Sequence, residues 1–444
     1  MAQSIQYNAN LALIGPSPSD SDHIGRMNYI RLMQGANISI SQPVDDVIGI
    51  GAKGSRGRKY LPPKLKGTFN YILSDGVNEK LFGFTVESPL DYQNPERVSF
   101  SNGLNSCGGI TDEDFRFFNN HNIFILTEKD GNDAVEVEND NLDNFSVFGM
   151  GNCYVDSYSL SCGVNEIPNV SLGFSAETFY LADYIPHTTG VSGEFISGMS
   201  VPAVSQEDGS ASEYMFNIHN EIYRLKDHAG SFDPMVETTG HFVTGITHPS
   251  FMEIYVSGSA IGMLSGSNNF NTPFQSLKLN LPIPRREQKS IKSKYNHDKP
   301  FVFPLEGSID FSMIVDEFVE GDARFFGQED FDIHLKFRGN VGDGSTSYTQ
   351  EYLNVFIKGA KIQAQSFSQA DSRMVWNTSM SFVEGESVNV FDREFHSGEK
   401  GIFFSGLSGL PQDDVISLNE SNAGAVFSEG AWICDNFASF ITLD

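Results

Sequence analysis

The chain contains an internal duplication, and no other feature of the sequence restricts its fold as strongly. Residues 114–177 align without gaps to residues 322–385 at a constant offset of 208. A repeat of this kind predicts two copies of one structural module. The identical positions are Asp114/Asp322, Arg116/Arg324, Phe117/Phe325, Phe118/Phe326, Gly131/Gly339, Asn132/Asn340, Val147/Val355, Phe148/Phe356, Gly151/Gly359, Asn169/Asn377, Ser171/Ser379 and Phe174/Phe382.

The similarity continues towards the N-terminus of each copy at a second offset of 240. Leu65 and Gly67 match Leu305 and Gly307, and the residues that follow alternate between apolar and polar in the same phase. Such alternation predicts half-buried strands. An earlier pair of strands corresponds as well, with Ile38 and Ile40 matched to Leu277 and Leu279. The change of offset indicates about 32 extra residues in the first copy.

The composition favours a fold made of strands. There are 37 Phe and 42 Gly residues, and helical spacing is sparse, with only Met215 to Leu225 offering a 3-4 pattern that also fits a strand. We therefore expect an all-β protein of two tandem, related β-sandwich or half-barrel domains with few short helices. The expected domains are residues 1–190, with an insertion at about 76–113, and residues 269–444, joined by an intervening segment at 191–268.

The net charge of −28 arises from 57 acidic and 29 basic side chains. It argues against a surface that grips nucleic acid, because affinity for DNA depends on Lys and Arg replacing phosphate counterions. It suits a wall that repels DNA, and simple solubility explains it equally well. We expect no membrane span and no signal peptide. The four cysteines, Cys107, Cys153, Cys162 and Cys434, lack metal-binding spacing, and we expect buried thiols.

No catalytic motif is present, so we expect neither an enzyme nor a cofactor or metal site. The chain lacks a G-x-S-x-G elbow, a Walker loop, an H-E-x-x-H helix and a dinucleotide fingerprint. The acidic run Asp130 to Asp133 resembles part of a calcium loop without its sixth-position Gly and twelfth-position Glu, and a hairpin turn is favoured. If an activity exists, Asp112 and Asp114 are the first residues to test.

Two polar features are the candidates for function. Each copy has a basic loop after its first strand, which either is simply solvated or contacts an acidic neighbouring subunit. The candidate loop residues are Lys53, Arg56, Arg58, Lys59, Arg285, Arg286, Lys289, Lys292 and Lys294. Polar residues of one parity after the Val-Phe-x-x-Gly motif suit a channel lining or an ordinary solvated sheet. These candidates are Ser157, Ser159, Ser161, Lys361, Gln363 and Gln365.

Several segments together resemble the tail tube proteins of long-tailed bacteriophages. The resemblance rests on Ser-Asp-Gly-x-Asn-Glu at Ser74 to Glu79, on Gly-Asn-Cys-x-Val-x-x-Tyr-Ser at Gly151 to Ser159, and on the Pro-x-Val-Ser-x-x-Phe segment that ends at Phe174. It covers most of the first half, and it extends to the second half through the repeat. The extra residues of the first copy and the long connection depart from a minimal tube domain.

The resemblance implies a particular assembly. Tube domains are β-sandwiches whose inner sheets join those of neighbours into a closed barrel, which removes exposed strand edges. A chain with two such domains implies trimeric rings with pseudo-sixfold symmetry, stacked into a tube through which DNA passes without specific binding. The long loops would contact the adjoining ring, and other tail proteins would be partners. The place of action would be the virion tail, assembled in the host cytoplasm.

Two other classes of function remain open from the sequence. A baseplate hub or tail-tip protein can also carry tube-like domains. A glycan-binding adhesin can have a β-sandwich too, although exposed aromatic platforms are expected there and the chain has only Trp376 and Trp432.

Overall fold

The structure, a computed structural model, confirms an all-β fold: apart from Asn78 and Glu79, which have helical backbone, the regular structure that it describes consists of strands. The described residues are 10–16, 28–47, 50, 53, 57–61, 64–74, 76, 78–79, 82–84, 86–87, 121–128, 145–164, 166–182, 252–257, 274–289, 296–302, 304–315, 330–341, 348–370, 373–384 and 401–406. Met215 to Leu225, Asp112, Asp114 and Asp130 to Asp133 lie outside this part of the chain.

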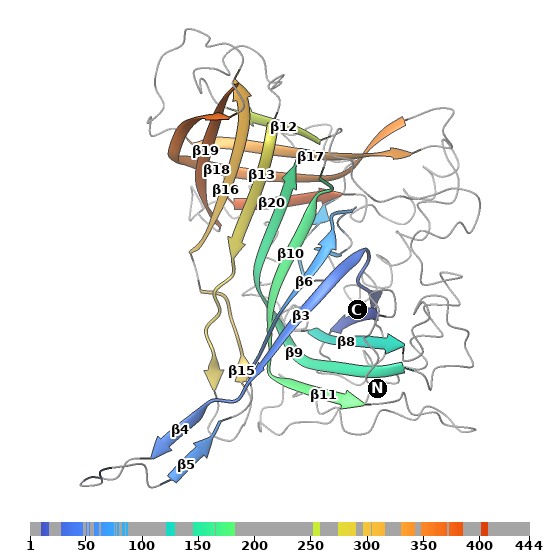
Figure 1. Cartoon of the computed structure of the whole chain (residues 1–444), viewed down its shortest axis with the longest axis vertical. Coiled ribbons are helices and arrows are strands. Elements are labelled where there is room, and N and C mark those ends of the chain that lie inside the picture. The colour runs from blue at the N-terminus through green and yellow to red at the C-terminus, as the bar shows by residue number, and fades with distance from the viewer. Residues whose placement is uncertain are drawn as a thin grey trace, which may run out of the picture.

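The strands of the first half precede those of the second half along the chain (Figure 1). The first half contains β1 (Asn10–Pro16), β2 (Asn28–Tyr29), β3 (Met33–Ser41), β4 (Val44–Val47), β5 (Gly57–Tyr60), β6 (Lys64–Ile72), β7 (Val86–Glu87), β8 (His121–Glu128), β9 (Phe145–Gly163), β10 (Asn169–Ala176) and β11 (Thr178–Ala182). The second half contains β12 (Met252–Ser257), β13 (Phe274–Pro282), β14 (Gln288–Lys289), β15 (Asn296–Asp298), β16 (Leu305–Val315), β17 (Phe331–Val341), β18 (Tyr348–Ala370), β19 (Arg373–Glu384) and β20 (Gly401–Gly406).

The two halves use the same strand order in two layers. In the front layer the order is β3-β6-β10-β9 in the first half and β13-β16-β19-β18 in the second. In the back layer it is β1-β8-β9-β11 and β12-β17-β18-β20, with antiparallel neighbours throughout. We call each half with its two layers a module. The repeated order is what a duplicated module would produce.

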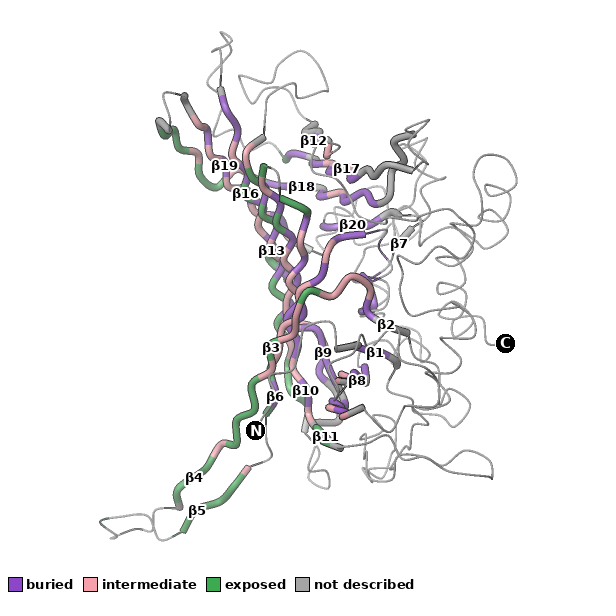
Figure 2. The backbone as a smooth tube through the Cα atoms, turned by 45° about the vertical axis from the view of Figure 1, so that its right-hand side comes forward, coloured by how far each residue is buried: buried purple, intermediate pink, exposed green. Residues whose placement is uncertain are grey.

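One long strand in each module belongs to both layers. The first part of β9 pairs with β8 and β11, and its second part pairs with β10. The first part of β18 likewise pairs with β17 and β20, and its second part with β19. Both strands bend where they pass from one layer to the other, and the apolar core fills the space between the layers (Figure 2).

The registers of the two modules agree residue by residue at the centre of the front layer. Gly67 faces Phe174 across β6 and β10, and Gly307 faces Phe382 across β16 and β19. A Cβ atom on either glycine would overlap the facing phenyl ring; at Gly67 it would lie 2.5 Å from Cζ of Phe174. The missing side chain therefore makes room for the ring, which also stacks on Phe69 at 4.6 Å. This matched Gly-Phe pair supports the duplication.

The first front-layer strands, β3 and β13, correspond differently from the match read in the sequence. Ile38 faces Gly67, whereas Leu277 faces Phe311, which occupies the place of Tyr71 in the first module. The structural counterpart of Leu277 is therefore near Met33, and that of Ile38 is Leu281. The sequence match was displaced by an even number of residues, which preserves the apolar-polar alternation.

Two strands extend the modules beyond the ranges expected for them. β12 falls in the segment assigned to the connection at 191–268, yet it pairs with β17 as β1 pairs with β8. The second module therefore begins before residue 269. β7 falls in the insertion of the first module and pairs in parallel with β20 of the second. The insertion thus links the modules, and Phe84 contacts Phe404 there at 5.4 Å between ring centroids.

The segment from Ser74 to Glu79 anchors the chain below the sheet. Gly76 has a φ of 91°, a left-handed conformation that favours glycine. The Asn78 side chain accepts a hydrogen bond from the Arg31 amide and donates one to the Arg31 carbonyl. The buried Glu79 carboxylate accepts hydrogen bonds from the Tyr71 and Tyr158 hydroxyls at 3.0 and 3.2 Å. The motif therefore has a structural role in this fold.

The two cysteines in the described part of the chain are buried thiols, as expected. Cys153 is almost fully buried, and burial raises the pKa of its thiol well above the usual range. Burial, with a contribution from Glu166, raises the pKa of Cys162 to about 11. Cys107 and Cys434 lie outside the described residues.

Replacing Gly67 by Ala should destabilise the protein by about 1–3 kcal/mol, because the added methyl group displaces the Phe174 ring from the core. Urea denaturation of the full chain measures the change. Gly35→Ala is the matched control, because a Cβ atom on this strand glycine meets nothing within 4 Å. Equal losses in the two variants would contradict the packing role. Adding Phe174→Leu to Gly67→Ala should cost less than the same change in the native chain.

Candidate functional site

The two modules are joined by a continuous ladder between β13 and β9. Leu279 faces Leu160 and Asn280 faces Ser159 in this antiparallel pairing. The first front-layer strand of the second module, β13, is therefore added to the edge of the first module. As a result, the two front layers form one sheet with the order β18-β19-β16-β13-β9-β10-β6-β3. This long sheet has one face on the core and one free face (Figure 2).

The free face, which we call the polar face, contains small hydroxyl and amide side chains. On β9, Ser157, Ser159 and Ser161 lie on this face at partial or full exposure. The alternate residues Tyr158 and Leu160 are fully buried. The three predicted serines therefore share one face, and other strands add Ser, Thr and Asn side chains beside them. These are Thr68, Asn70, Ser171, Ser276, Asn280, Ser308, Ser312, Asn377, Ser379 and Ser381.

The three candidates on β18 do not share one face. Lys361 and Gln363 are exposed on the polar face, and Gln363 donates a hydrogen bond to Ser381 at 2.6 Å. A bulge between Ile362 and Ala364 reverses the alternation. Gln365 consequently pairs with the buried Thr378 and lies on the core side, so the expectation for this residue was wrong.

The basic loop of the first module forms an exposed hairpin, β4–β5, which projects from the end of the sheet (Figure 1). Lys53, Arg58 and Lys59 are exposed there, and Arg56 lies outside the described residues. Arg58 forms an ion pair with Asp46 at 3.2 Å. We call this hairpin the first arm. Its basic residues are thus available at the surface, accompanied by acidic residues of the same hairpin.

The basic loop of the second module, the second arm, begins with an arginine that is engaged inside the chain. The Arg285 guanidinium donates hydrogen bonds to the carbonyl oxygens of Val155 at 2.8 Å and Lys299 at 3.0 Å. It also lies 4.1 Å from the centroid of the Phe301 ring. Arg285 was grouped with the inter-ring contacts, and it instead fixes the arm to the first module. Arg286 is exposed.

Of the remaining candidates of the second arm, Lys289 pairs with Asn296 in the short β14–β15 ladder. Lys289 lies on β14, and Lys292 and Lys294 fall outside the described residues.

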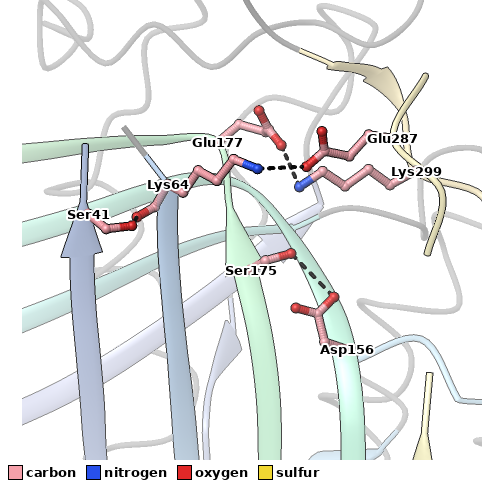
Figure 3. Close-up of polar contacts among 7 residues, drawn as sticks. All are labelled: Ser41, Lys64, Asp156, Ser175, Glu177, Glu287 and Lys299. Carbon is pink, nitrogen blue, oxygen red and sulfur yellow. Dashed lines mark hydrogen bonds and ion pairs between the residues drawn. The ribbon is translucent and has the colours of Figure 1, made fainter. Parts of the chain in front are cut away.

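Ion pairs tie the root of the second arm to the first module (Figure 3). Lys299 forms a buried ion pair with Glu177, which directly follows β10, and its ammonium group lies 5.0 Å from the Tyr154 ring centroid. Glu287 forms an exposed ion pair with Lys64 at 3.4 Å. These contacts lie next to the lower end of the β13–β9 ladder. They hold the two modules in one relative position.

Two titratable groups near this junction have shifted pKa values. Burial raises the pKa of Asp156, although a hydrogen bond from Ser175 at 3.2 Å and the charges of Arg285 and Lys299 oppose the rise. Burial lowers the pKa of His121 to about 4, and the positive charge of Arg285 adds to the effect. His121 is therefore neutral at pH 7.

Both ends of the long sheet expose strand edges within the described part of the chain. At one end, β3 pairs only with β6; at the other, the second part of β18 pairs only with β19. Ile40, three residues beyond Asn37, is 48% exposed, whereas Ile283, three residues beyond Asn280, is 1% exposed at the internal junction. Ile40 at the β3 edge thus lacks the burial that Ile283, its counterpart after β13, has at the junction of the modules.

The described residues show neither a metal site nor a helical membrane span. No group of His, Cys, Asp and Glu side chains gathers there as metal ligands do, and no helix is long and apolar enough to cross a bilayer. Acidic and basic side chains are almost equal in number in this part of the chain. Nearly all of the net charge of −28 is therefore carried by residues outside it.

Sequence reasoning missed the residues that build the junction. Lys299, which follows the candidate residues of the second basic loop, was not among the candidates, and Glu177 and Asp156 were not singled out either. A weak signal was available in the position of Glu177, which directly follows the repeated strand β10. An acidic side chain there stays in solvent unless another element covers it and supplies a partner. The partner of Glu177 is Lys299 of the second module, and this pairing could be found only by knowing that β13 pairs with β9.

No family model matches the chain, and no curated protein matches it significantly.

Replacing Lys299 by Met should lower the free energy of unfolding by about 3–5 kcal/mol, because Glu177 would keep a buried charge without its ammonium partner. Chemical denaturation measures this loss. Arg286→Met, a change of an exposed neighbour, should alter stability by at most about 0.5 kcal/mol. In the double variant Lys299→Met/Glu177→Gln the loss should be smaller than in Lys299→Met alone. A larger loss in the double variant would contradict the pair.

Proposed function

We propose that the chain is a structural protein of the tail of a bacteriophage, namely the tail tube subunit. The proposal is carried by one observation: a module of this protein already adds its first front-layer strand to the edge of another module, and the same donor and acceptor edges recur at the two ends of the long sheet. Its mode of action is mechanical and electrostatic, and the proposal assigns it no catalytic residue.

The donor edges of the two modules can be matched through their inner neighbours. Asn37 on β3 faces Thr68, and Asn280 on β13 faces Ser308. Thr68 and Ser308 are equivalent because each directly follows the matched glycine of its module. Asn37 and Asn280 therefore occupy the same place, and β3 has the strand geometry that β13 uses at the internal junction.

The acceptor edges can be matched in the same way. Ser159 on β9 faces Ser171, and Ala364 on β18 faces Ser379. Ser171 and Ser379 are identical positions of the repeat, so Ala364 corresponds to Ser159. Because Asn280 faces Ser159 inside the chain, Asn37 of one copy should face Ala364 of the next. Such β-augmentation satisfies backbone groups at both edges.

Successive additions of this kind form a closed ring when the rotations between neighbouring modules add up to a full turn. Closure removes the exposed edges that an isolated chain presents to solvent. Three copies with two modules each would give a pseudo-sixfold ring. The exposed first arm projects from the end of the sheet. In the proposed tube, this arm would contact the next ring. Stacked rings would then form a tube in the virion tail, assembled in the host cytoplasm with other tail proteins.

The polar face fits the wall of an aqueous conduit for DNA. Its side chains are mostly hydroxyls and amides, and large apolar groups lie on the opposite, core-facing side of the same strands. The described strands do not form the strongly acidic wall that the net charge of the chain suggested. Transit without adhesion would depend on a neutral surface with few unpaired cations.

A glycan-binding function receives less support from the described residues. Trp376, one of the two tryptophans, is 1% exposed and packs in the core beside Phe367. It therefore offers no platform on which a sugar ring can stack. A glycan array with strong signals from a protein that does not assemble would favour this function over the tube.

Electron microscopy of the purified full-length protein tests the proposed function. We expect rings or long hollow tubes, because each copy offers one donor and one acceptor edge. Isolated trimers that never stack would favour a baseplate hub or tail-tip position. A monodisperse monomer at high concentration would overturn the proposal.

Cysteine cross-linking tests the register between copies. In a background with Cys107→Ser and Cys434→Ser, the double variant Asn37→Cys/Ala364→Cys should give disulfide-linked oligomers on mild oxidation, because facing strand residues have Cβ atoms within disulfide reach. Non-reducing gel electrophoresis reads the product.

Two matched variants control this experiment. Asn280→Cys/Ser159→Cys places the same pair at the internal junction and should cross-link within one chain. Asn37→Cys/Ser368→Cys moves one partner four residues along β18 and should not form linked oligomers. Cross-linking within the chain but not between copies would contradict the proposed contact.

A further inference from the structure

The lysines of the polar face lie next to carboxylates. Lys64 forms its ion pair with Glu287 at 3.4 Å, and Lys361 forms one with Asp330 at 3.6 Å. Lys278 is directly opposite Asp310 in the pairing of β13 with β16, and both are exposed on this face.

The remaining lysine on the described part of this face is Lys66, next to the serine-lined strands. Its charge is one of several that lower the pKa of the partly buried Asp156. The three pairs, Lys64 with Glu287, Lys361 with Asp330 and Lys278 with Asp310, come from different strands and from both modules, so they are spread along the face. Lys64 and Lys361 therefore have ion-pair partners in the protein itself, and Lys278 has a carboxylate on the residue that faces it.

This pairing has a direct consequence for contact with a polyanion. A lysine binds DNA by replacing the counterions condensed on a phosphate, and the gain comes from counterion release. A lysine that already has a carboxylate beside it gains less, because the phosphate must compete with that carboxylate and is repelled by it. Without the carboxylates, the same face would present four free cations among hydrogen-bonding hydroxyls.

We infer that Asp310, Asp330 and Glu287 act as electrostatic masks, which prevent the lysines of the polar face from holding the phosphate backbone of DNA. The inference rests on the proposed function, since it supposes that this face meets DNA. It assigns the non-adhesive property to individual charge pairs and not to the total charge of the chain.

The lysines themselves have a structural use that explains their presence. Lys64 and Glu287 connect β6 of the first module to the arm of the second. Opposite charges on facing residues, as in Lys278 and Asp310, stabilise an antiparallel pair of strands. A face with neither charge would lose these links, whereas a face with lysines alone would retain DNA.

The test compares two double variants of the full-length protein that change net charge equally. Asp310→Asn/Asp330→Asn exposes Lys278 and Lys361. Glu166→Gln/Glu306→Gln removes two exposed carboxylates; Glu306 lies on the polar face opposite Val383, and Glu166 lies in the turn before β10. Fluorescence anisotropy with a short random-sequence DNA duplex, at about 20 to 200 mM KCl, measures affinity.

We expect the first double variant to bind DNA at least about tenfold more tightly than the native protein at low salt. Its binding should weaken more steeply with salt, by about 0.9 in the logarithmic slope for each exposed lysine. The second double variant should bind like the native protein. Adding Lys278→Gln/Lys361→Gln to the first double variant should abolish the gain.

Equal gains in both double variants would show that only net charge matters and would overturn the inference. Absence of any gain in Asp310→Asn/Asp330→Asn would overturn it as well. Circular dichroism verifies that the variants fold. These outcomes are separate from the microscopy of tubes: tubes without a DNA gain would reject the masks alone, and a failure to assemble would reject the proposed function.

Discussion

The β13–β9 ladder is the contact on which the rest of the structure depends. It converts two separate front layers into one sheet, aligns their polar sides on one face and places the second arm against the first module. Backbone hydrogen bonds fix the antiparallel register of β13 on β9. Arg285, Lys299 and Glu287 add charged contacts at the lower end of the ladder. Without the ladder, the polar face would be divided between two separate sheets. The chain would also contain no pairing of a donor edge with an acceptor edge from which the contact between copies could be inferred.

The modules differ in one buried polar cluster. In the first module, Tyr71 and Tyr158 donate hydrogen bonds to the buried Glu79, whereas the corresponding positions in the second module are Phe311 and Ile362. The two tyrosine hydroxyls thus occur in the module that contains the buried Glu79 carboxylate, and the corresponding positions of the other module carry apolar side chains. A buried carboxylate is tolerated only with such partners, so this difference follows from the loop that contains Glu79.

Much of the fold could be predicted from the sequence, because repeated glycines and phenylalanines mark repeated contacts. Gly67 with Phe174 and Gly307 with Phe382 gave a correct correspondence for the central strands. The first strands were matched wrongly, since a shift by an even number leaves the alternation of Ile38 and Leu277 unchanged. Gln365 was misplaced because a bulge is invisible in an alternating pattern. Arg285 and Lys299 could not be assigned either, because their partners come from the other module.

The covalent connection of the two modules has a kinetic consequence for any assembly that uses these edges. Within one chain, the β13 and β9 edges meet at an effective concentration that is set by the connecting segment. Their pairing therefore avoids the loss of translational and rotational entropy that accompanies the association of separate molecules. Half of the joints in a closed ring would then exist before two molecules collide. Nucleation would depend on a lower power of protein concentration than for single-module subunits, and growth could start in a dilute pool.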